Sequence, residues 1–364
     1  MQGGGQPIEA DNDGFASRAF TYDAVIPTAG EHLSLLAQAI ESVERQTVPP
    51  RRILVIVDGN ANAAEVVSER HPRVEVVLQP KLGVAAARQH GVELATSTWI
   101  AFLDDDDLWL PWKQARTAQY LAGHPDCRAL RAGFWMFAAP DDPAEGLNGH
   151  RVELRASSLD EFISALGSAS PRNDMEYLDI EGDSLGLLLQ FNRGVIGTTV
   201  VERKLAQGLP PVPRGTVAAD DWLFFLEVAK RAEWHLVRAR LLGYRVHSGQ
   251  ATQRKGIEGP RAILAAKKYA WESMGANVPH PLVSYGQWYR SEIRQLAWAR
   301  VRNGRPWEGL VLLAEGAPLL PRWQDRFMAS VPEPMVWRAD ALLRRVGRSR
   351  ASHSGGACQA PPQW

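Results

Sequence analysis

Four consecutive aspartates, Asp104 to Asp107, follow an apolar run that begins at Trp99. Such a run is typical of a strand buried on both faces of a parallel sheet, and open α/β sheets bind ligands beyond the carboxyl ends of such strands. Four adjacent carboxylates repel one another and are costly to bury unpaired. Mg²⁺ and Mn²⁺ take oxygen ligands and usually bind with substrate phosphates. We therefore predict a divalent metal beside a phosphate; the alternative is a solvated acidic turn that caps the next helix.

Two further positions carry side chains that could do chemistry. Asp220 and Asp221 begin an expected helix, and adjacent acids push each other's pKa apart, which favours one usable proton acceptor. On the residues alone, capping of that helix is the better interpretation. His247 follows an apolar segment, and its imidazole suits Mn²⁺ as a ligand. A lone histidine after a strand is more often a surface residue, so both interpretations stay open.

The first part of the chain alternates apolar strands with helical patterns. Expected strands cover 22–28, 53–57, 74–78 and 99–103, and expected helices cover 31–46, 62–70 and 82–95. Repeated strand–helix units with short loops predict a mostly parallel, doubly wound α/β sheet with helices on both faces. The four aspartates follow the last of these strands, at the edge where a ligand would bind.

The pattern changes after about residue 126. Expected elements there are strands at 128–137, 195–201, 234–238 and 241–246, and helices at 159–166 and 220–231. The region 258–347 is expected to be helical. Between Ser284 and Arg350 it carries twelve arginines against six acidic residues, with several tryptophans. We favour packing of these helices on the α/β domain, with Trp inside and Arg solvated; the alternative is peripheral contact with the inner face of a membrane.

The composition limits the class of protein. Apolar residues make up 45% and charged residues 23% of the 364 positions, as in a soluble globular protein. The formal net charge is zero, so the protein has no overall positive charge that would favour binding of nucleic acid. The two cysteines, Cys127 and Cys358, exclude a disulfide scaffold and fit a reducing compartment. Without a secretory leader or an apolar run of about 18 residues, a cytoplasmic protein is expected.

The order and spacing of several short segments resemble family 2 glycosyltransferases. These segments are Ile26-Pro27-Thr28, Val57-Asp58-Gly59, Gly83 with Ala87-Arg88, and Phe102 to Pro111 around the four aspartates. The resemblance covers roughly residues 21–250 and implies the GT-A fold. It implies inverting transfer of a sugar from a nucleotide sugar, with UDP the expected nucleotide, to a hydroxyl of a carbohydrate or lipid-linked acceptor. The process implied is polysaccharide, glycolipid or other glycoconjugate biosynthesis.

The resemblance also implies a role for each matching residue. Asp221 would be the general base, with Asp220 as its neighbour. Asp106 would hold a Mn or Mg ion on the diphosphate, and His247 would complete the metal site. Small residues at 194–199 would let a strand approach the donor sugar closely. Nucleotide-sugar binding is implied for Pro27, Thr28, Asp58, Lys81, Gly83, Arg88, Asp104 and Asp105.

The composition and patterns of the sequence, together with this resemblance, divide the chain into five expected parts. They are a disordered tail (1–20), a nucleotide-sugar-binding half of the GT-A domain (21–125), an acceptor-binding half (126–257), a C-terminal helical region (258–347) and a second disordered tail (348–364).

Two departures from the family pattern keep an alternative function open. Val57 stands where the second strand usually ends in a first acid, and Glu227 stands where the acceptor helix often has an arginine. The alternative is a degenerate GT-A-like protein that only binds carbohydrate or a partner. A nucleotidyltransferase is disfavoured because the glycine run at 3–5 precedes the first strand. A membrane-embedded processive synthase is disfavoured because the chain lacks a Gln-x-x-Arg-Trp segment.

Overall fold

The computed structural model consists of two compact units, residues 1–279 and 280–364. The residues that it describes are 20–142, 146–147, 150–167, 181–190, 194–213, 219–247, 249–250, 258–270, 273, 293–298, 300–301 and 304–316. The expected tails at 1–20 and 348–364 lie outside these ranges, apart from Phe20. Phe20 is buried and stacks on Tyr22, with 5.2 Å between the ring centroids.

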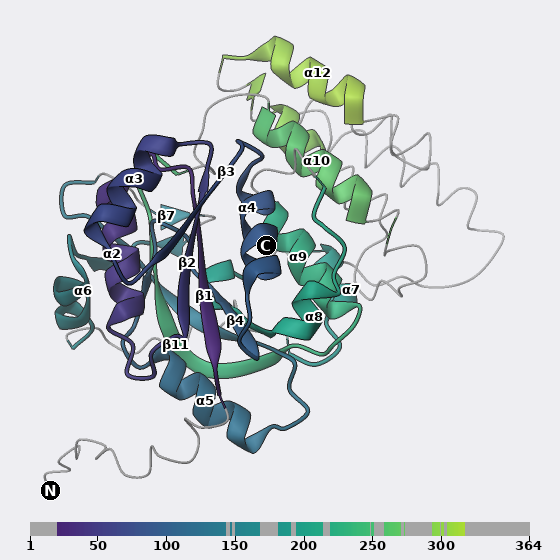
Figure 1. The fold of residues 1–364 in the computed structure, drawn as a ribbon. Coiled ribbons are helices and arrows are strands. Elements are labelled where there is room, and N and C mark those ends of the chain that lie inside the picture. Colours follow the sequence, from purple (N-terminus) through teal and green to yellow (C-terminus); the bar gives the residue numbers. More distant parts are fainter. Residues whose placement is uncertain are drawn as a thin grey trace, which may run out of the picture. The chain divides into compact units, whose positions relative to one another are not determined.

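The predicted strand–helix alternation is confirmed in the first part of the chain (Figure 1). Strands β1, β2, β3 and β4 run parallel in the order β3-β2-β1-β4. Nearly every residue of β1, β2 and β4 is buried, which explains why these strands have continuous apolar sequences. The elements are β1 (Tyr22–Thr28), α2 (Leu33–Glu44), β2 (Arg52–Asp58), α3 (Ala61–Arg70), β3 (Glu75–Gln79), α4 (Val84–Leu94) and β4 (Trp99–Phe102).

The later strands extend the same sheet and make it mixed, in the order β3-β2-β1-β4-β10-β6-β11-β5. Strand β10 runs antiparallel to both of its neighbours, β11 runs parallel to β6, and β5 runs antiparallel to β11. A short strand, β9, also pairs with β6. These strands are β5 (Leu108–Trp109), β6 (Ala129–Ala138), β9 (Leu154–Arg155), β10 (Val200–Glu202) and β11 (His235–Arg245); β7 (Gly146–Leu147) and β8 (His150–Arg151) form a separate pair.

Helices cover both faces of the sheet, as a doubly wound fold requires. Side chains of α4, α8 and α9 pack on one face, with Val25 and Ile56 from the strands. Side chains of α2, α3 and α5 pack on the other, with Ile26 and Val55. Figure 1 shows α2 and α3 on the opposite side of the sheet from α4. The remaining helices are α5 (Lys113–Gly123), α6 (Leu159–Leu166), α7 (Leu185–Gln190), α8 (Arg203–Gln207), α9 (Asp220–Ala229), α10 (Glu258–Ala270) and, in the second unit, α12 (Pro306–Gly316).

Three predicted strands differ from the structure. The segment 195–201 is not one strand, because residues Ile196–Thr198 form a 3₁₀ turn before β10. The turn uses backbone groups that a strand would offer to its neighbours: the amide of Thr199 donates to the carbonyl of Ile196 at 2.9 Å. The two strands expected at 234–238 and 241–246 are the single strand β11, with an irregular register between Val237 and Leu242.

The C-terminal helices are present where the structure describes them. We expected the tryptophans of this region to be buried, but Trp307 on α12 is 79% exposed, so the prediction is wrong for this residue. The tryptophans at 271, 288, 323 and 337 lie outside the described residues. No helix in the described ranges is long and apolar enough to cross a membrane.

Candidate active site

The carboxyl ends of β1 and β4 are joined by a side-chain hydrogen bond. The hydroxyl of Thr28 donates to the carboxylate of Asp105, and the backbone amide of Gly30 donates to the same hydroxyl oxygen at 2.9 Å. Burial and the neighbouring charge of Asp106 raise the pKa of Asp105 to about 7. Pro27 is buried within β1. Asp105 is therefore attached to the end of β1.

Asp58 anchors the loop that leads into α4. Its carboxylate accepts hydrogen bonds from the side-chain amide of Gln79 at 2.8 Å, from the backbone amide of Leu82 at 2.8 Å and from that of Gly83 at 2.9 Å. Gly83, at φ 95°, is the residue before the first turn of α4. Lys81, in the same loop, is exposed. The sequence placed Asp58 correctly at a strand end, and in the structure its carboxylate also positions this loop.

Arg88, on α4, lies between the acids of the two halves of the first unit. Its guanidinium donates to Asp104 at 2.6 Å and to the carboxylate of Asp220. Burial opposes the charge of Arg88, but the charges of Asp104 and Asp220 raise its pKa above the usual value. Arg88 therefore stays charged and joins the end of β4 to the start of α9.

The two acids at the start of α9 have different surroundings. Asp220 is buried and paired with Arg88. The carboxylate of Asp221 accepts a hydrogen bond from the backbone amide of Trp222 at 2.7 Å. Burial and the charge of Asp220 raise the pKa of Asp221 to about 7. A carboxylate that titrates near neutral pH can accept a proton from a bound hydroxyl group.

Asp106 and His247 lie together, as the sequence predicts for a metal site. The Oδ2 atom of Asp106 is 3.1 Å from Nε2 of His247, and the two side chains are 23% and 14% exposed. The described residues contain no group of three or more His, Cys, Asp or Glu side chains arranged to hold a metal. Two protein ligands still fit Mg²⁺ or Mn²⁺, because these ions take most of their other ligands from phosphate and water.

Asp107, the last acid of the run, has a structural partner. Its Oδ1 atom accepts a hydrogen bond from the backbone amide of Arg245 at 2.9 Å, and burial raises its pKa well above the usual value. The guanidinium of Arg245 donates to the backbone carbonyl of Asp106 at 2.8 Å. Strand β11 therefore holds the acidic turn in place and brings His247, which follows it, to Asp106.

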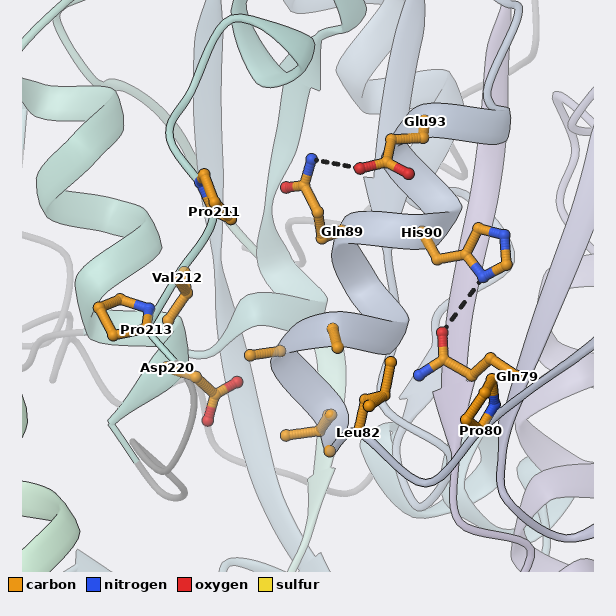
Figure 2. A pocket seen from close by; sticks show the side chains of 14 residues that line it. Gln79, Pro80, Leu82, Gln89, His90, Glu93, Pro211, Val212, Pro213 and Asp220 are labelled. Carbon is orange, nitrogen blue, oxygen red and sulfur yellow. Dashed lines mark hydrogen bonds between the residues drawn. The ribbon is translucent and has the colours of Figure 1, made fainter.

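A pocket opens beside α4 and reaches Asp220 (Figure 2). Its volume is about 620 Å³, which is within the range of small-molecule sites. Along α4, Gln89 donates to Glu93 at 3.1 Å, and a ring nitrogen of His90 lies 3.2 Å from the side chain of Gln79. The segment 211–213 forms the facing wall. The pocket therefore combines an apolar wall with hydrogen-bonding side chains next to the acids of α9.

The part of the chain that supplies β1 to β4 and the four acids matches one family. A sequence model described as "Glycosyl transferase family 2" covers residues 23–127. These residues form a family 2 glycosyltransferase domain. This domain contains Thr28, Asp58, Arg88 and the four acids, whereas the acids of α9 and His247 lie beyond it.

Two curated relatives and one solved structure extend the comparison. The succinoglycan biosynthesis protein ExoW of Rhizobium meliloti is 35% identical over 94 residues, which are 24% of this chain and 30% of ExoW. The amylovoran biosynthesis glycosyltransferase AmsE of Erwinia amylovora is 31% identical over 96 residues, which are 25% of this chain and 36% of AmsE. The chain thus matches about a third of each relative's length.

The solved structure shows the fold. Residues 1–349 of S. aureus TarS, determined in complex with UDP-GlcNAc, superpose with a TM-score of 0.51 at 10% sequence identity. The superposition covers 83% of this chain and 82% of that one. Together with the family 2 domain, this likeness identifies the mixed sheet and its helices as a GT-A-type α/β fold, as the sequence predicts.

The structure brings six of the twelve predicted site residues into two groups. Arg88 links Asp104 to the start of α9, and Asp106 meets His247. Sequence reasoning missed Arg131, which is 4% exposed on β6. The signal was an arginine at the centre of an apolar strand, where a charged side chain needs a partner.

Proposed function

We propose that this protein is an inverting glycosyltransferase that moves a sugar from a nucleotide-diphosphate sugar to an acceptor hydroxyl. The observation that carries the proposal is the bridge made by Arg88, which joins Asp104 on the donor side to Asp220 on the acceptor side. Next to this bridge stands Asp221, a carboxylate with a pKa of about 7. A donor-side acid cluster and a usable base thus lie on either side of one arginine.

Asp221 is the general base in this proposal. The acceptor oxygen forms a bond to the anomeric carbon while the bond from that carbon to the diphosphate breaks, and the hydroxyl proton passes to Asp221. Attack from the face opposite the leaving group inverts the anomeric carbon without a covalent enzyme intermediate. Asp220 serves mainly to hold Arg88, because its carboxylate is buried against the guanidinium.

Asp106 and His247 are the residues that would hold a divalent cation. A carboxylate and an imidazole suit Mn²⁺, and a carboxylate with phosphate oxygens suits Mg²⁺. Such an ion supplies Lewis-acid stabilisation of the leaving diphosphate when it is bound. The contact between Asp107 and Arg245 supports this assignment, because it fixes the turn that presents Asp106.

The two halves of the GT-A domain would divide the substrates between them. We assign the nucleotide sugar, with UDP the first nucleotide to test, to residues 21–125 and the acceptor to residues 126–257. The pocket beside α4 is lined mostly by residues of the nucleotide-sugar half and reaches Asp220 of the acceptor half, which supports a site that both substrates share. ExoW and AmsE carry the names of polysaccharide pathways, which makes a glycan-building role the one to test.

Thermal unfolding with nucleotides tests the proposal without knowledge of the acceptor. A ligand that binds only the folded protein raises Tm by mass action. We expect one of UDP, GDP and dTDP to raise Tm in the presence of Mn²⁺ and to have little effect without it. The corresponding nucleotide sugar should then release its nucleoside diphosphate slowly in water. A protein that responds to none of the three would instead support the carbohydrate- or partner-binding alternative.

A further inference from the structure

His32 is an exposed histidine beside the residues that would hold a cation, and the proposed mechanism does not use it. It immediately precedes α2, and its ring meets the ring of His247 edge to face, with 5.4 Å between the centroids and 88° between the planes. Aromatic rings attract one another in this arrangement, because the edge of one is positive and the face of the other negative. The contact therefore joins the chain after β1 to the chain after β11.

The backbone that carries His32 is held on both sides. The carbonyl of His32 accepts hydrogen bonds from the amides of Leu35 and Leu36, each at 3.0 Å, which attaches it to the first turn of α2. Two residues earlier, the amide of Gly30 donates to the hydroxyl of Thr28 at 2.9 Å. A Cβ atom added to Gly30 would come within 2.3 Å of a side chain of α3, so this loop is closely packed. The ring of His32 is thus attached to a fixed segment.

The backbone of His247 is also fixed, by the turn that follows β11. The side-chain amide of Gln250 donates to the carbonyl of Arg245 at 2.6 Å, and the backbone amide of Gln250 donates to the carbonyl of His247 at 3.2 Å. The imidazole of His247 is held less firmly: among the described residues, its hydrogen-bonding contact is the one between Nε2 and Asp106 at 3.1 Å. A single contact at one ring atom does not fix the rotation of the ring.

Gly249 leaves the space in which the two rings meet. A Cβ atom added to it would lie 2.9 Å from Nε2 of His32 and 3.2 Å from Nδ1 of His247. A side chain at this position would therefore push the rings apart. In most metal sites a carboxylate, a carbonyl or a water orients the histidine ligand through its second nitrogen. Within the described part of the chain, the second nitrogen of His247 lies beside Gly249, and the neighbouring group that contacts the ring is His32.

We propose that His32 is a positioning residue for His247: its ring, in the space left by Gly249, holds the imidazole of His247 with Nε2 directed at Asp106, so that both side chains can bind one divalent cation. The proposal rests on the assignment of Asp106 and His247 to the cation. His32 is not a ligand in this proposal, since the described residues contain no group of three such side chains arranged to hold a metal.

NMR of the metal-free, full-length protein tests the orientation of His247 without any ligand. In protein labelled with ¹³C and ¹⁵N at histidine, the two ring systems are assigned by their loss in His32→Phe and His247→Gln. Three-bond couplings to Cγ of His247 then report whether its ring occupies one rotamer. We expect one rotamer in wild type and in His32→Phe, which keeps an aromatic ring, and averaging in His32→Ala and Gly249→Ala. His71→Ala, at the carboxyl end of α3, is the matched control.

Mn²⁺ affinity tests the consequence for the cation. It is measured by EPR of the free ion, with each of UDP, GDP and dTDP present. Loss of a group that orients a metal ligand typically weakens metal binding by about ten- to a hundredfold, so His32→Ala should raise the Kd for Mn²⁺ by about tenfold. His32→Phe should bind Mn²⁺ nearly as wild type does. In a His247→Ala background, His32→Ala should cause no further loss, because His32 acts through His247.

A single rotamer of His247 in His32→Ala would overturn the proposal. It would also fall if His32→Phe lost as much Mn²⁺ affinity as His32→Ala, or if His32→Ala weakened binding in the His247→Ala background, because His32 would then contact the cation or the phosphates itself. A rotamer that depends on His32 in a protein that binds no Mn²⁺ would keep the positioning role and reject the cation. Mn²⁺ binding that depends on His32, without turnover of any nucleotide sugar, would keep the positioning role and reject the transferase.

Discussion

The four acids that follow β4 have four different partners. Arg88 binds Asp104, Thr28 binds Asp105, His247 lies against Asp106, and the backbone of Arg245 binds Asp107; the distances are given above. The contacts of Asp104, Asp105 and Asp107 each join separate elements of the fold. The contact between Asp106 and His247 differs from these three, because a carboxylate and an imidazole can both bind a divalent cation. Asp106 is therefore the acid whose loss should affect metal-dependent binding without affecting the fold.

We predict that Asp106→Ala abolishes the Mn²⁺-dependent effect of the active nucleotide. Wild-type Tm should rise by about 5 °C with saturating nucleotide and Mn²⁺, whereas the variant should show little change. The variant's own Tm should remain near that of wild type, because Asp106 is at a partly exposed edge. Asp126→Ala, in an exposed turn of the same domain, serves as control. An undiminished nucleotide response in Asp106→Ala would remove the metal role from this residue.

A second prediction at this scale concerns Asp221. Asp221→Asn should bind the nucleotide normally and lose transfer by about a hundredfold or more, the usual scale for a general base. In the wild-type enzyme the base acts when deprotonated, and its pKa is about 7. The rate should therefore fall as pH decreases below about 7 and level off above it. Steady-state rates from pH 5 to 9 measure both effects. A larger loss in Asp220→Asn would mean that the roles of the two acids are reversed.

Helix α5 buries a lysine whose burial the periodicity of the sequence does not predict. Lys113, in its first turn, is 1% exposed, and its ammonium nitrogen lies 4.4 Å from the ring centroid of Trp109. Within the described ranges this nitrogen has no hydrogen-bond partner. Burial lowers the pKa of Lys113 to about 7. The packing of α5 therefore buries a lysine whose amine is neutral above about pH 7.

Lys113→Met should therefore stabilise the protein. We expect a gain of about 1–3 kcal/mol in the free energy of unfolding at pH 7, since an unsatisfied polar group is replaced by an apolar one. Unfolded Lys113 binds its proton up to about pH 10.5, so between pH 7 and 10.5 the unfolded state binds more protons and wild-type stability rises with pH. The stability that Lys113→Met gains over wild type should therefore decrease between pH 7 and pH 10.5.

Urea unfolding of this variant at pH 7 and pH 9.5 gives the comparison. Arg116→Met, on the exposed side of the same helix, should change stability little at either pH. If Lys113→Met destabilised the protein at both values, the contact between the ammonium group and Trp109 would outweigh the burial of the amine.

At the scale of the first unit, Arg88 connects parts that are distant in sequence. The match to the family 2 model ends at residue 127, and the second group of acids begins at residue 220. Helix α4 lies on the face of the sheet where α9 also packs (Figure 1). From α4 the side chain of Arg88 reaches both Asp104 and Asp220. The arrangement that we propose for catalysis would thus depend on one buried cation, Arg88.

Arg88→Met should destabilise the protein by about 3–5 kcal/mol at pH 8, because it leaves the buried carboxylate of Asp220 and the partly buried carboxylate of Asp104 without their counter-charge. Carboxylates in that environment have raised pKa values, as Asp104 already has in the wild type, and they take up protons as pH falls. The folded variant then binds more protons than the unfolded chain, so the deficit should be smaller at pH 5 than at pH 8.

Denaturant unfolding at the two pH values measures this dependence. Arg45→Met, which removes an exposed pair with Glu41 and Asp160, should have a small effect that does not depend on pH in the same way. An equal deficit for Arg88→Met at both pH values would show that packing of the side chain, and not its charge, is what the fold requires.

The local pattern of the sequence determined the elements of this protein to a large extent. Apolar runs and helical spacing located β1 to β4 and their helices, and α6 was predicted at residues 159–166, as the structure has it. The position of the acids at the end of β4 followed from the same patterns. These features depend on residues close together in the chain, whose periodicity directly reflects burial. The family resemblance then named the acids of α9, which local physics alone interpreted as a helix cap.

Only the tertiary structure decided which partner each charged side chain meets. Arg88 with Asp220, Arg245 with Asp107 and Arg131 with Phe225 each join residues separated by more than 90 positions, and no local pattern specifies such pairs. The same holds for the 3₁₀ turn at 196–198, where the chain redirects before β10 despite residues that favour a strand. Burial raises the energetic cost of an unpaired charge, so the packed sheet and helices select those partners once the chain has folded.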